Sequence, residues 1–208
     1  MRKKAYGQYI DNHDVVVRFN LVPLDPKHVG ARTTVRLLNF ASSKKACGGG
    51  QGSLSTDRGR SLGELRAVML WHRLSRGSVF KCVKDKTLSG SEVTASEIGP
   101  GSQRKLRETM KAIRKDLERL KVRAMKPAFA QELTSGAQAV LLAMGHCQHV
   151  SVYGLSSFEV VDYRASNGYH YRGRATLRVT GHKVHDWAME AGAWRLLFAA
   201  GKISLCAT

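Results

Sequence analysis

Hydrophobic residues recur at helical spacing between Gln103 and Lys126, the clearest helix that the sequence predicts. They follow one another at intervals of 4, 3, 4 and 3, at Leu106, Met110, Ile113, Leu117 and Leu120. This spacing puts them on one face of a helix. The other face carries ten Lys or Arg against three acids. Such a face fits a polyanion-binding surface or a solvated surface, and we favour the solvated one.

The segment from Leu133 to Gly154 predicts a loop, a buried helix and a buried strand in direct succession. Thr134 and Ser135 are N-cap residue types, and the following residues up to Met144 are largely apolar all round. A helix start of this kind presents backbone N–H groups and the positive end of its dipole, which suit a phosphate. By themselves these residues favour a plain capped core helix.

Shorter patterns predict the remaining elements. The run Val15–Val17 predicts a buried strand that carries Arg18 and Asn20 to its carboxyl end, where a parallel sheet binds ligands. The Gly- and Ser-rich residues 41–61 predict a flexible surface insertion. Further patterns predict a strand over Val35–Phe40, a helix over Leu62–Arg76, a strand over Val79–Val83, a loop over Thr87–Ser102, a helix from Trp187 to Phe198 and a strand over Gly201–Leu205.

The composition indicates one α/β domain, because 208 residues with 43% hydrophobic side chains can bury a core. The formal net charge of +18 raises nucleic acid or an anionic membrane as partners. Its distribution weakens both. Lys and Arg exceed Asp and Glu by 7 in residues 1–60 and by 7 in 101–126, but by only 2 in 61–100 and 2 in 127–208.

The sequence gives little direct information on the compartment. No apolar run reaches the roughly 20 residues of a membrane span, and the basic N-terminus does not lead into the apolar core of a signal peptide. The four cysteines lack the paired spacing of a zinc site and are too few for a disulfide scaffold. They leave the redox environment open.

Two segments near the N-terminus resemble the large sialyl motif of eukaryotic sialyltransferases. Ile10–Asn20 reads IDNHDVVVRFN, and Val29–Thr34 reads VGARTT. The second half of the family motif is Ile-Asp-x-His-Asp-x-Val-x-Arg-x-Asn followed by Val-Gly-x-[Arg/Lys]-Thr-Thr. The motif's first half, a Cys, a strand and a Gly-Asn turn, has no match in this chain. The resemblance therefore leads us to expect an N-terminally truncated product, a fragmentary gene model or a domain whose missing part lies elsewhere. It also implies that Cys147, a structural residue, lacks its usual disulfide partner.

Three later segments resemble the small, third and very small sialyl motifs, in that order: Thr134–Gly154, Tyr169–Gly173 and His185–Glu190. The third match is partial, because Arg172 and Gly173 stand where the family has Tyr and an acid. The resemblance implies an α/β fold, a single GT-A-like (Rossmann-like) sheet flanked by helices that lacks its first strand.

The resemblance also implies two catalytic histidines. His185 is expected to be the general base, and its place just before a helix favours the neutral imidazole that a base requires. His182 competes for this role only through proximity. His170, when protonated, is expected to donate to the departing phosphate. Glu190 lies about 140° around the helix from His185, so it cannot orient the base, and we interpret it as structural.

The resemblance implies that the donor is CMP-sialic acid or a related CMP-linked acid sugar, whose sugar is transferred with inversion to a glycan hydroxyl. Galactose-terminated glycans are the expected acceptors. The expected substrate-binding residues are Asn20, Thr134, Ser135, Gly136, Tyr171 and Arg172. We expect no metal, because no Asp-x-Asp pair is present and the family uses none.

The family further implies the Golgi lumen and a type II membrane anchor outside this chain. Two other classes of protein stay open. One is a catalytically inactive remnant that keeps the sialyltransferase fold. The other is a basic nucleic-acid-binding protein, which the charge permits although no RNA-recognition pattern or zinc finger is present.

Overall fold

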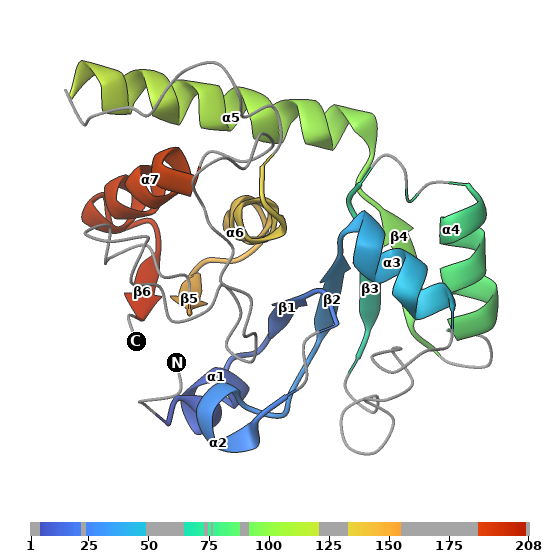
Figure 1. Cartoon of the computed structure of the whole chain (residues 1–208). Coiled ribbons are helices and arrows are strands. Elements are labelled where there is room, and N and C mark those ends of the chain that lie inside the picture. Colours follow the sequence, from blue (N-terminus) through green and yellow to red (C-terminus); the bar gives the residue numbers. More distant parts are fainter. Residues whose placement is uncertain are drawn as a thin grey trace. The chain divides into compact units, whose positions relative to one another are not determined.

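The computed structural model describes residues 5–21, 24–48, 65–72, 75, 77–87, 92–120, 133–154 and 187–206. Its packing divides it into two compact units, one within Lys3–Gln103 and one within Arg104–Thr208. Each unit has a parallel sheet and helices (Figure 1). The α/β class predicted from the sequence is thus confirmed, whereas the single domain stays a prediction.

The first unit is built on a parallel sheet of four strands in the order β1-β2-β3-β4. The strands are β1 (Val17–Phe19), β2 (Val35–Leu38), β3 (Ala67–Leu70) and β4 (Thr94–Glu97). Short helices precede β1 and β2, namely α1 (Gly7–Asp11) and α2 (Pro26–Val29). The segments after β2 and β3 form α3 (Phe40–Cys47), α4 (Ser78–Cys82) and a π-helical turn, η4 (Val83–Thr87).

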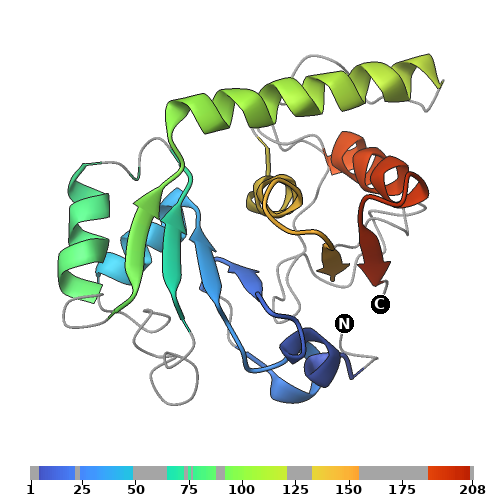
Figure 2. The same cartoon turned by 180° about the vertical axis from the view of Figure 1, so that it is seen from behind.

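Helices α3 and α4 lie against one face of this sheet, as the two opposite views show (Figures 1 and 2). The apolar side chains between them form one buried cluster of Leu38, Ala46, Leu65, Val68, Leu70 and Val83. In a parallel sheet the crossover connections carry helices back over the faces. These helices bury the apolar side chains of the strands. The cluster packs α3 and α4 onto the sheet, and α3 begins directly after the carboxyl end of β2.

Asp11 connects three segments at the opposite, amino-terminal end of the strands. Its carboxylate accepts hydrogen bonds from the N–H groups of Ala31 and Arg32, at 2.8 and 3.0 Å, and lies 3.8 Å from the guanidinium of Arg18. Arg32 donates in return to the carbonyls of Asp11 and His13, both at 2.6 Å. These residues belong to the large-motif segments, so the motif encodes a scaffold at this end of the sheet.

Two glycines allow this scaffold to close. Gly30 has a φ of +79°, and a Cβ there would lie 2.2 Å from Oδ1 of Asp11. A Cβ on Gly7 would lie 1.7 Å from the carbonyl oxygen of Pro26. Both separations are far below van der Waals contact, so the α1–α2 contact and the turn before β2 require glycine.

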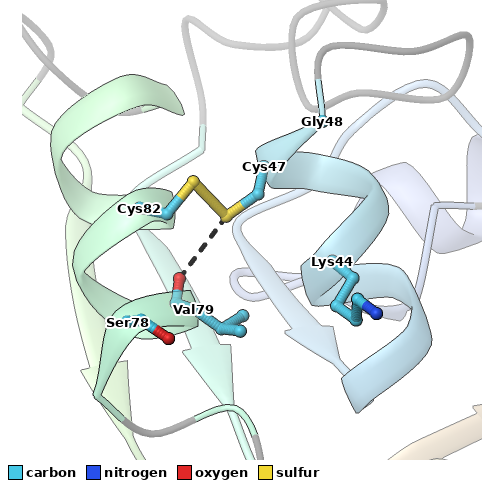
Figure 3. Close-up of a pocket in the computed structure, with 6 residues that line it drawn as sticks. All are labelled: Lys44, Cys47, Gly48, Ser78, Val79 and Cys82. Atoms are coloured by element: carbon cyan, nitrogen blue, oxygen red, sulfur yellow. Dashed lines mark hydrogen bonds between the residues drawn. A yellow bond between two sulfur atoms is a disulfide. The ribbon is translucent and has the colours of Figure 1, made fainter.

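A disulfide between Cys47 and Cys82 joins the end of α3 to the end of α4, with the Cα atoms 5.7 Å apart (Figure 3). It borders an open hollow of about 270 Å³ whose lining includes Lys44, Ser78 and Val79. Sγ of Cys47 also lies 3.6 Å from the carbonyl oxygen of Val79. Cysteine spacing does not reveal this pair, because 35 residues separate the two cysteines and the fold brings them together.

The second unit packs three helices over a two-stranded parallel sheet, β5 (Ser151–Tyr153) with β6 (Ser204–Cys206). The helices are α5 (Pro100–Arg119, whose first turn precedes the unit boundary), α6 (Ser135–Met144) and α7 (Trp187–Ala199). Their shared core contains Leu106, Met110, Ile113, Leu117, Leu133, Ala137, Val140, Leu141, Val152, Ala193, Trp194 and Ile203.

The predictions for strongly patterned segments are confirmed. Helices α5, α6 and α7 and strands β2, β5 and β6 form close to their predicted places. In α5, four of the five residues of the predicted apolar face are buried; the fifth, Leu120, lies beyond the helix end and is exposed. The strand predicted at Val15–Val17 forms two residues later than predicted. Strand β1 begins at Val17, and Val15 is exposed.

The predictions for weakly patterned segments are wrong in four places. The expected insertion at 41–61 begins as helix α3, and residues 49–64 lie outside the described part. The expected helix over Leu62–Arg76 contains β3, and the expected strand over Val79–Val83 is mostly helix α4. The expected loop over Thr87–Ser102 contains β4 and the first turn of α5. In short segments, tertiary packing outweighs local propensity.

None of the helices in the described part of the chain is both long enough and apolar enough to cross a membrane.

Gly30→Ala will destabilise the first unit more than Gly77→Ala, although both positions have positive φ. A Cβ at Gly77 meets no atom within 4 Å, whereas one at Gly30 strikes the Asp11 carboxylate. We expect Gly77→Ala to cost about 1–2 kcal/mol from the backbone alone. Gly30→Ala should cost about 1–3 kcal/mol more from overpacking. Urea unfolding measures the difference, and equal costs would contradict the importance of this contact.

Candidate functional site

The structure describes six of the ten residues that the sequence predicts for the site: Asn20, Thr134, Ser135, Gly136, Cys147 and Glu190. Asn20 belongs to the first unit and the other five to the second. His170, Tyr171, Arg172 and His185 lie outside the described residues. Their expected roles stay predictions.

Asn20 directly follows β1 at the carboxyl edge of the four-stranded sheet. It has a φ of +55° and is the one non-glycine residue with positive φ in the described part of the chain. Asparagine tolerates this left-handed conformation better than most residues. Its N–H donates to the carbonyl of Leu37 at 2.7 Å, which ties the turn to the neighbouring strand β2.

Hydrogen bonds also fix the side-chain amide of Asn20. The N–H of Asn39 donates to Oδ1 at 3.1 Å. Because a backbone N–H is only a donor, this contact identifies the oxygen, and Nδ2 therefore lies on the other side of the planar amide. No residue within the described ranges accepts a hydrogen bond from Nδ2. Asn20 is half-buried, so it presents a donor at the sheet edge where ligands of α/β proteins bind.

Aromatic side chains follow β2 and β3 at the same edge. The rings of Phe40 and His72 stack with their centroids 5.7 Å apart, and Trp71 meets His72 edge-on at 5.3 Å. The carbonyl of Trp71 accepts a hydrogen bond from the side chain of Gln103. Local sequence patterns do not reveal these residues, because they predict a helix where β3 runs and do not show that two distant segments end side by side.

The start of α6 is capped by Thr134, as its residue type predicts. The hydroxyl of Thr134 accepts from the N–H of Ala137 at 3.0 Å, and its carbonyl accepts from the N–H of Gln138 at 3.0 Å. The first turn of a helix has further N–H groups without intrahelical acceptors. Ser135 and Gly136 provide the backbone of this turn, and Ser135 is the partly exposed member of the pair. An anion is stabilised at such a terminus.

Glu190 in the first turn of α7 holds this cap in place. Its carboxylate accepts two hydrogen bonds from Thr134, one from the N–H at 2.8 Å and one from the hydroxyl at 2.7 Å. Both residues are buried, with exposed fractions of 4% and 7%. The hydroxyl of Thr134 therefore donates to Glu190 and accepts from Ala137. This geometry gives Thr134 a structural role, and Ser135 is the hydroxyl of this turn that is partly exposed.

Cys147 follows α6 and is exposed with a free thiol. It is not part of a buried disulfide in the described structure, where the one disulfide joins two cysteines of the first unit. In the described part of the chain, no three His, Cys, Asp or Glu side chains lie where they could hold a metal ion.

Glu190→Ala will destabilise the second unit, because it leaves the buried N–H and hydroxyl of Thr134 without their acceptor. We expect a cost of about 2–4 kcal/mol. Glu190→Gln should cost less, since a glutamine oxygen still accepts from the N–H and its amide can donate to the hydroxyl. Glu118→Ala, on the exposed face of α5, is the matched control and should stay within about 0.5 kcal/mol of the wild type. Denaturant unfolding tests this order, and a neutral Glu190→Ala would contradict it.

Comparison with known proteins places these features in a family. The sequence profile of "Glycosyltransferase family 29 (sialyltransferase)" matches residues 1–202. No curated protein sequence matches significantly. Among solved structures, a crystal structure of a mammalian sialyltransferase superposes with a TM-score of 0.63 at 17% identity. The match covers 99% of this chain and 64% of that protein, so this chain spans about two thirds of its length. The chain therefore belongs to glycosyltransferase family 29, the sialyltransferase family.

Proposed function

We propose that the protein transfers sialic acid, or a related acid sugar, from a CMP-linked donor to a glycan hydroxyl with inversion of configuration. The observation that carries the proposal is the family match over residues 1–202. The α/β fold shared with a mammalian sialyltransferase supports it. So do two anion- and nucleotide-compatible features in the described residues, the oriented Asn20 amide and the capped start of α6.

Each of these two features is proposed by itself as a place that suits part of the donor's nucleotide. The Nδ2 group of Asn20 would donate to a phosphate or ribose oxygen. Ser135 and the backbone around Gly136 would contact the ribose and cytosine at the start of α6, where the helix dipole favours the phosphate charge. Tyr171 and Arg172 are proposed as further donor-site residues, with Arg172 facing the phosphate or the donor carboxylate.

The proposed reaction is a single displacement at C2 of the donor sugar. The acceptor oxygen attacks C2 while the bond between C2 and the phosphate oxygen breaks, and CMP leaves from the opposite face. The hydroxyl proton passes to His185, and protonated His170 donates a hydrogen bond to the departing phosphate. We propose that no metal is needed, because the chain has no Asp-x-Asp pair of the kind that metal-dependent sugar-nucleotide transferases use.

The Golgi lumen is the proposed location, with a type II membrane anchor outside this chain as the family resemblance implies. The disulfide between Cys47 and Cys82 supports an oxidising compartment. Structural disulfides persist in secretory compartments and are rare in the cytosol. The sequence alone left this point open, since the spacing of the cysteines did not reveal the pair.

Asn20→Asp will weaken CMP binding. Aspartate tolerates the positive φ and keeps an oxygen for the N–H of Asn39, but it replaces the Nδ2 donor with a negatively charged oxygen. Losing a hydrogen bond to a charged group predicts an affinity lower by about 10- to 100-fold. Calorimetric titration with CMP measures it.

Asn12→Asp is the matched control for this substitution. Asn12 is exposed and lies at the end of α1, so the same charge change occurs in the same unit away from the sheet's carboxyl edge. Its CMP affinity should equal that of the wild type. If Asn20→Asp binds CMP as the wild type does, Asn20 has no part in the donor site.

His185→Ala will abolish most transfer while leaving CMP binding intact, because a general base acts on the acceptor proton and not on the nucleotide. Loss of general-base catalysis predicts a rate lower by about 10²- to 10⁴-fold. Transfer from CMP-sialic acid to galactose-terminated acceptors measures it, and His149→Ala, at an exposed position after α6, is the control.

The transfer assay, run on the wild-type chain together with CMP binding, distinguishes a sialyltransferase from an inactive remnant and from a nucleic-acid-binding protein. Donor binding without transfer at any pH between roughly 5 and 8, where histidine titrates, would indicate a catalytically inactive remnant. Salt-sensitive retention on nucleic acid together with no CMP binding would indicate a basic nucleic-acid-binding protein.

A further inference from the structure

Arg36 is a fully charged side chain buried in the middle of the four-stranded sheet. It lies on β2, next to Arg18 of β1 and Val68 of β3 in the register, and its exposed fraction is 1%. A guanidinium stays protonated in proteins and is costly to remove from water. Its neighbours on the same strand, Leu37 and Leu38, are buried apolar residues of the kind that a covered parallel strand requires. An arginine at this position therefore calls for a specific role.

The guanidinium of Arg36 reaches the turn after β1. Its Nη1 donates to the carbonyl oxygen of Asn20 at 3.0 Å. Asn20 is the residue held at a φ of +55°, and its N–H is bonded to the carbonyl of Leu37 on β2. Both backbone polar groups of Asn20 are thus bonded to β2, one to its backbone and one to the Arg36 side chain.

A second set of bonds fixes the Asn20 side chain relative to this backbone. Oδ1 accepts from the N–H of Asn39, which is the N-cap residue of α3. Asn39 is itself immobilised, because its Oδ1 accepts from the N–H of Ser42 at 2.8 Å and its carbonyl accepts from the hydroxyl of Ser43 at 2.7 Å. With the backbone held by Arg36 and the amide held by Asn39, only Nδ2 of Asn20 is left as a donor toward a ligand.

We infer that Arg36 is a positioning residue for the donor nucleotide, acting through Asn20. This inference rests on the proposed function, which gives Asn20 its nucleotide. Arg36 is too buried to reach a ligand at the surface, so its effect is to keep Asn20 in the left-handed conformation in which Oδ1 is bound to Asn39 and Nδ2 is left as a donor. When a binding-competent conformation is populated only in part, the apparent affinity falls by that fraction.

Substitution of Arg36 tests this inference in a double-mutant cycle with Asn20. Arg36→Met replaces the guanidinium with an unbranched apolar side chain and should weaken CMP binding about 10-fold, as expected if Asn20 is competent about a tenth of the time. Asn20→Gly keeps the backbone freedom for positive φ but has no amide, so CMP binding is already weakened. In the Asn20→Gly background, Arg36→Met should cause no further loss of CMP affinity, because the effect of Arg36 passes through the amide.

Two additional variants separate positioning from general stability. Arg36→Lys keeps the charge and a donor and should restore part of the affinity; it also serves if Arg36→Met does not fold. Arg32→Met removes hydrogen bonds at the other end of the sheet, so it should lower the melting temperature and leave the CMP affinity of the folded protein unchanged. The same loss of affinity from Arg36→Met with and without the Asn20 amide would overturn the inference.

A readout without ligand keeps this inference distinct from the proposed function. The Cα and Cβ chemical shifts of Asn20 report its backbone conformation, and they should indicate the left-handed region in the wild type and leave it in Arg36→Met. Unchanged shifts would overturn the inference. Changed shifts in a chain that does not bind CMP would refute the donor role of Asn20 and retain Arg36 as the residue that holds its conformation.

Discussion

The first unit depends on the contacts that the carboxylate of Asp11 makes with three segments of the chain. It accepts the N–H groups of Ala31 and Arg32 and lies beside the guanidinium of Arg18, so it ties α1 to β1 and to the turn before β2. Hydrogen bonds to a charged acceptor are the stronger kind, and here they are made at a point where Gly30 leaves no space for a side chain. This junction lies where the chain enters the first two strands, which pair in parallel from Val17 and Val35 onward.

Asn20, the residue proposed for the donor site, directly follows β1. Asn20 follows from the strand that Asp11 and Arg18 anchor, and Arg36 and Asn39 of the neighbouring segment then hold its backbone and amide. In the second unit Glu190 has a comparable part, because it fixes Thr134 and with it the start of α6. In both places a buried charged side chain orients a residue of a family motif: Arg36 binds the carbonyl of Asn20, and Glu190 binds Thr134. Residues of a recurring motif can thus be required for geometry although they touch no substrate.

The second unit shows how far hydrophobic periodicity carries a sequence-based prediction. Four apolar residues of α5 at helical spacing are buried, and Thr134 caps α6. Both features can be predicted from sequence because each depends on residues within one or two turns of the same helix. The weakly patterned residues 65–97 were predicted wrongly in most places. There β3 and β4 exist because they pair with a neighbouring strand, and the chain between them folds as α4 because it covers the sheet. Local sequence does not contain that information.

The spaced large and small motifs are enough to indicate the family, and hydrophobic periodicity is enough to place the long helices. The tertiary structure alone decided that Glu190 meets Thr134, that Cys47 meets Cys82 and that Arg36 reaches Asn20, pairs separated by 56, 35 and 16 residues. A spacing along the chain reports contacts within a helix or strand, whereas these contacts arise from the order of strands in a sheet and the packing of helices on one another.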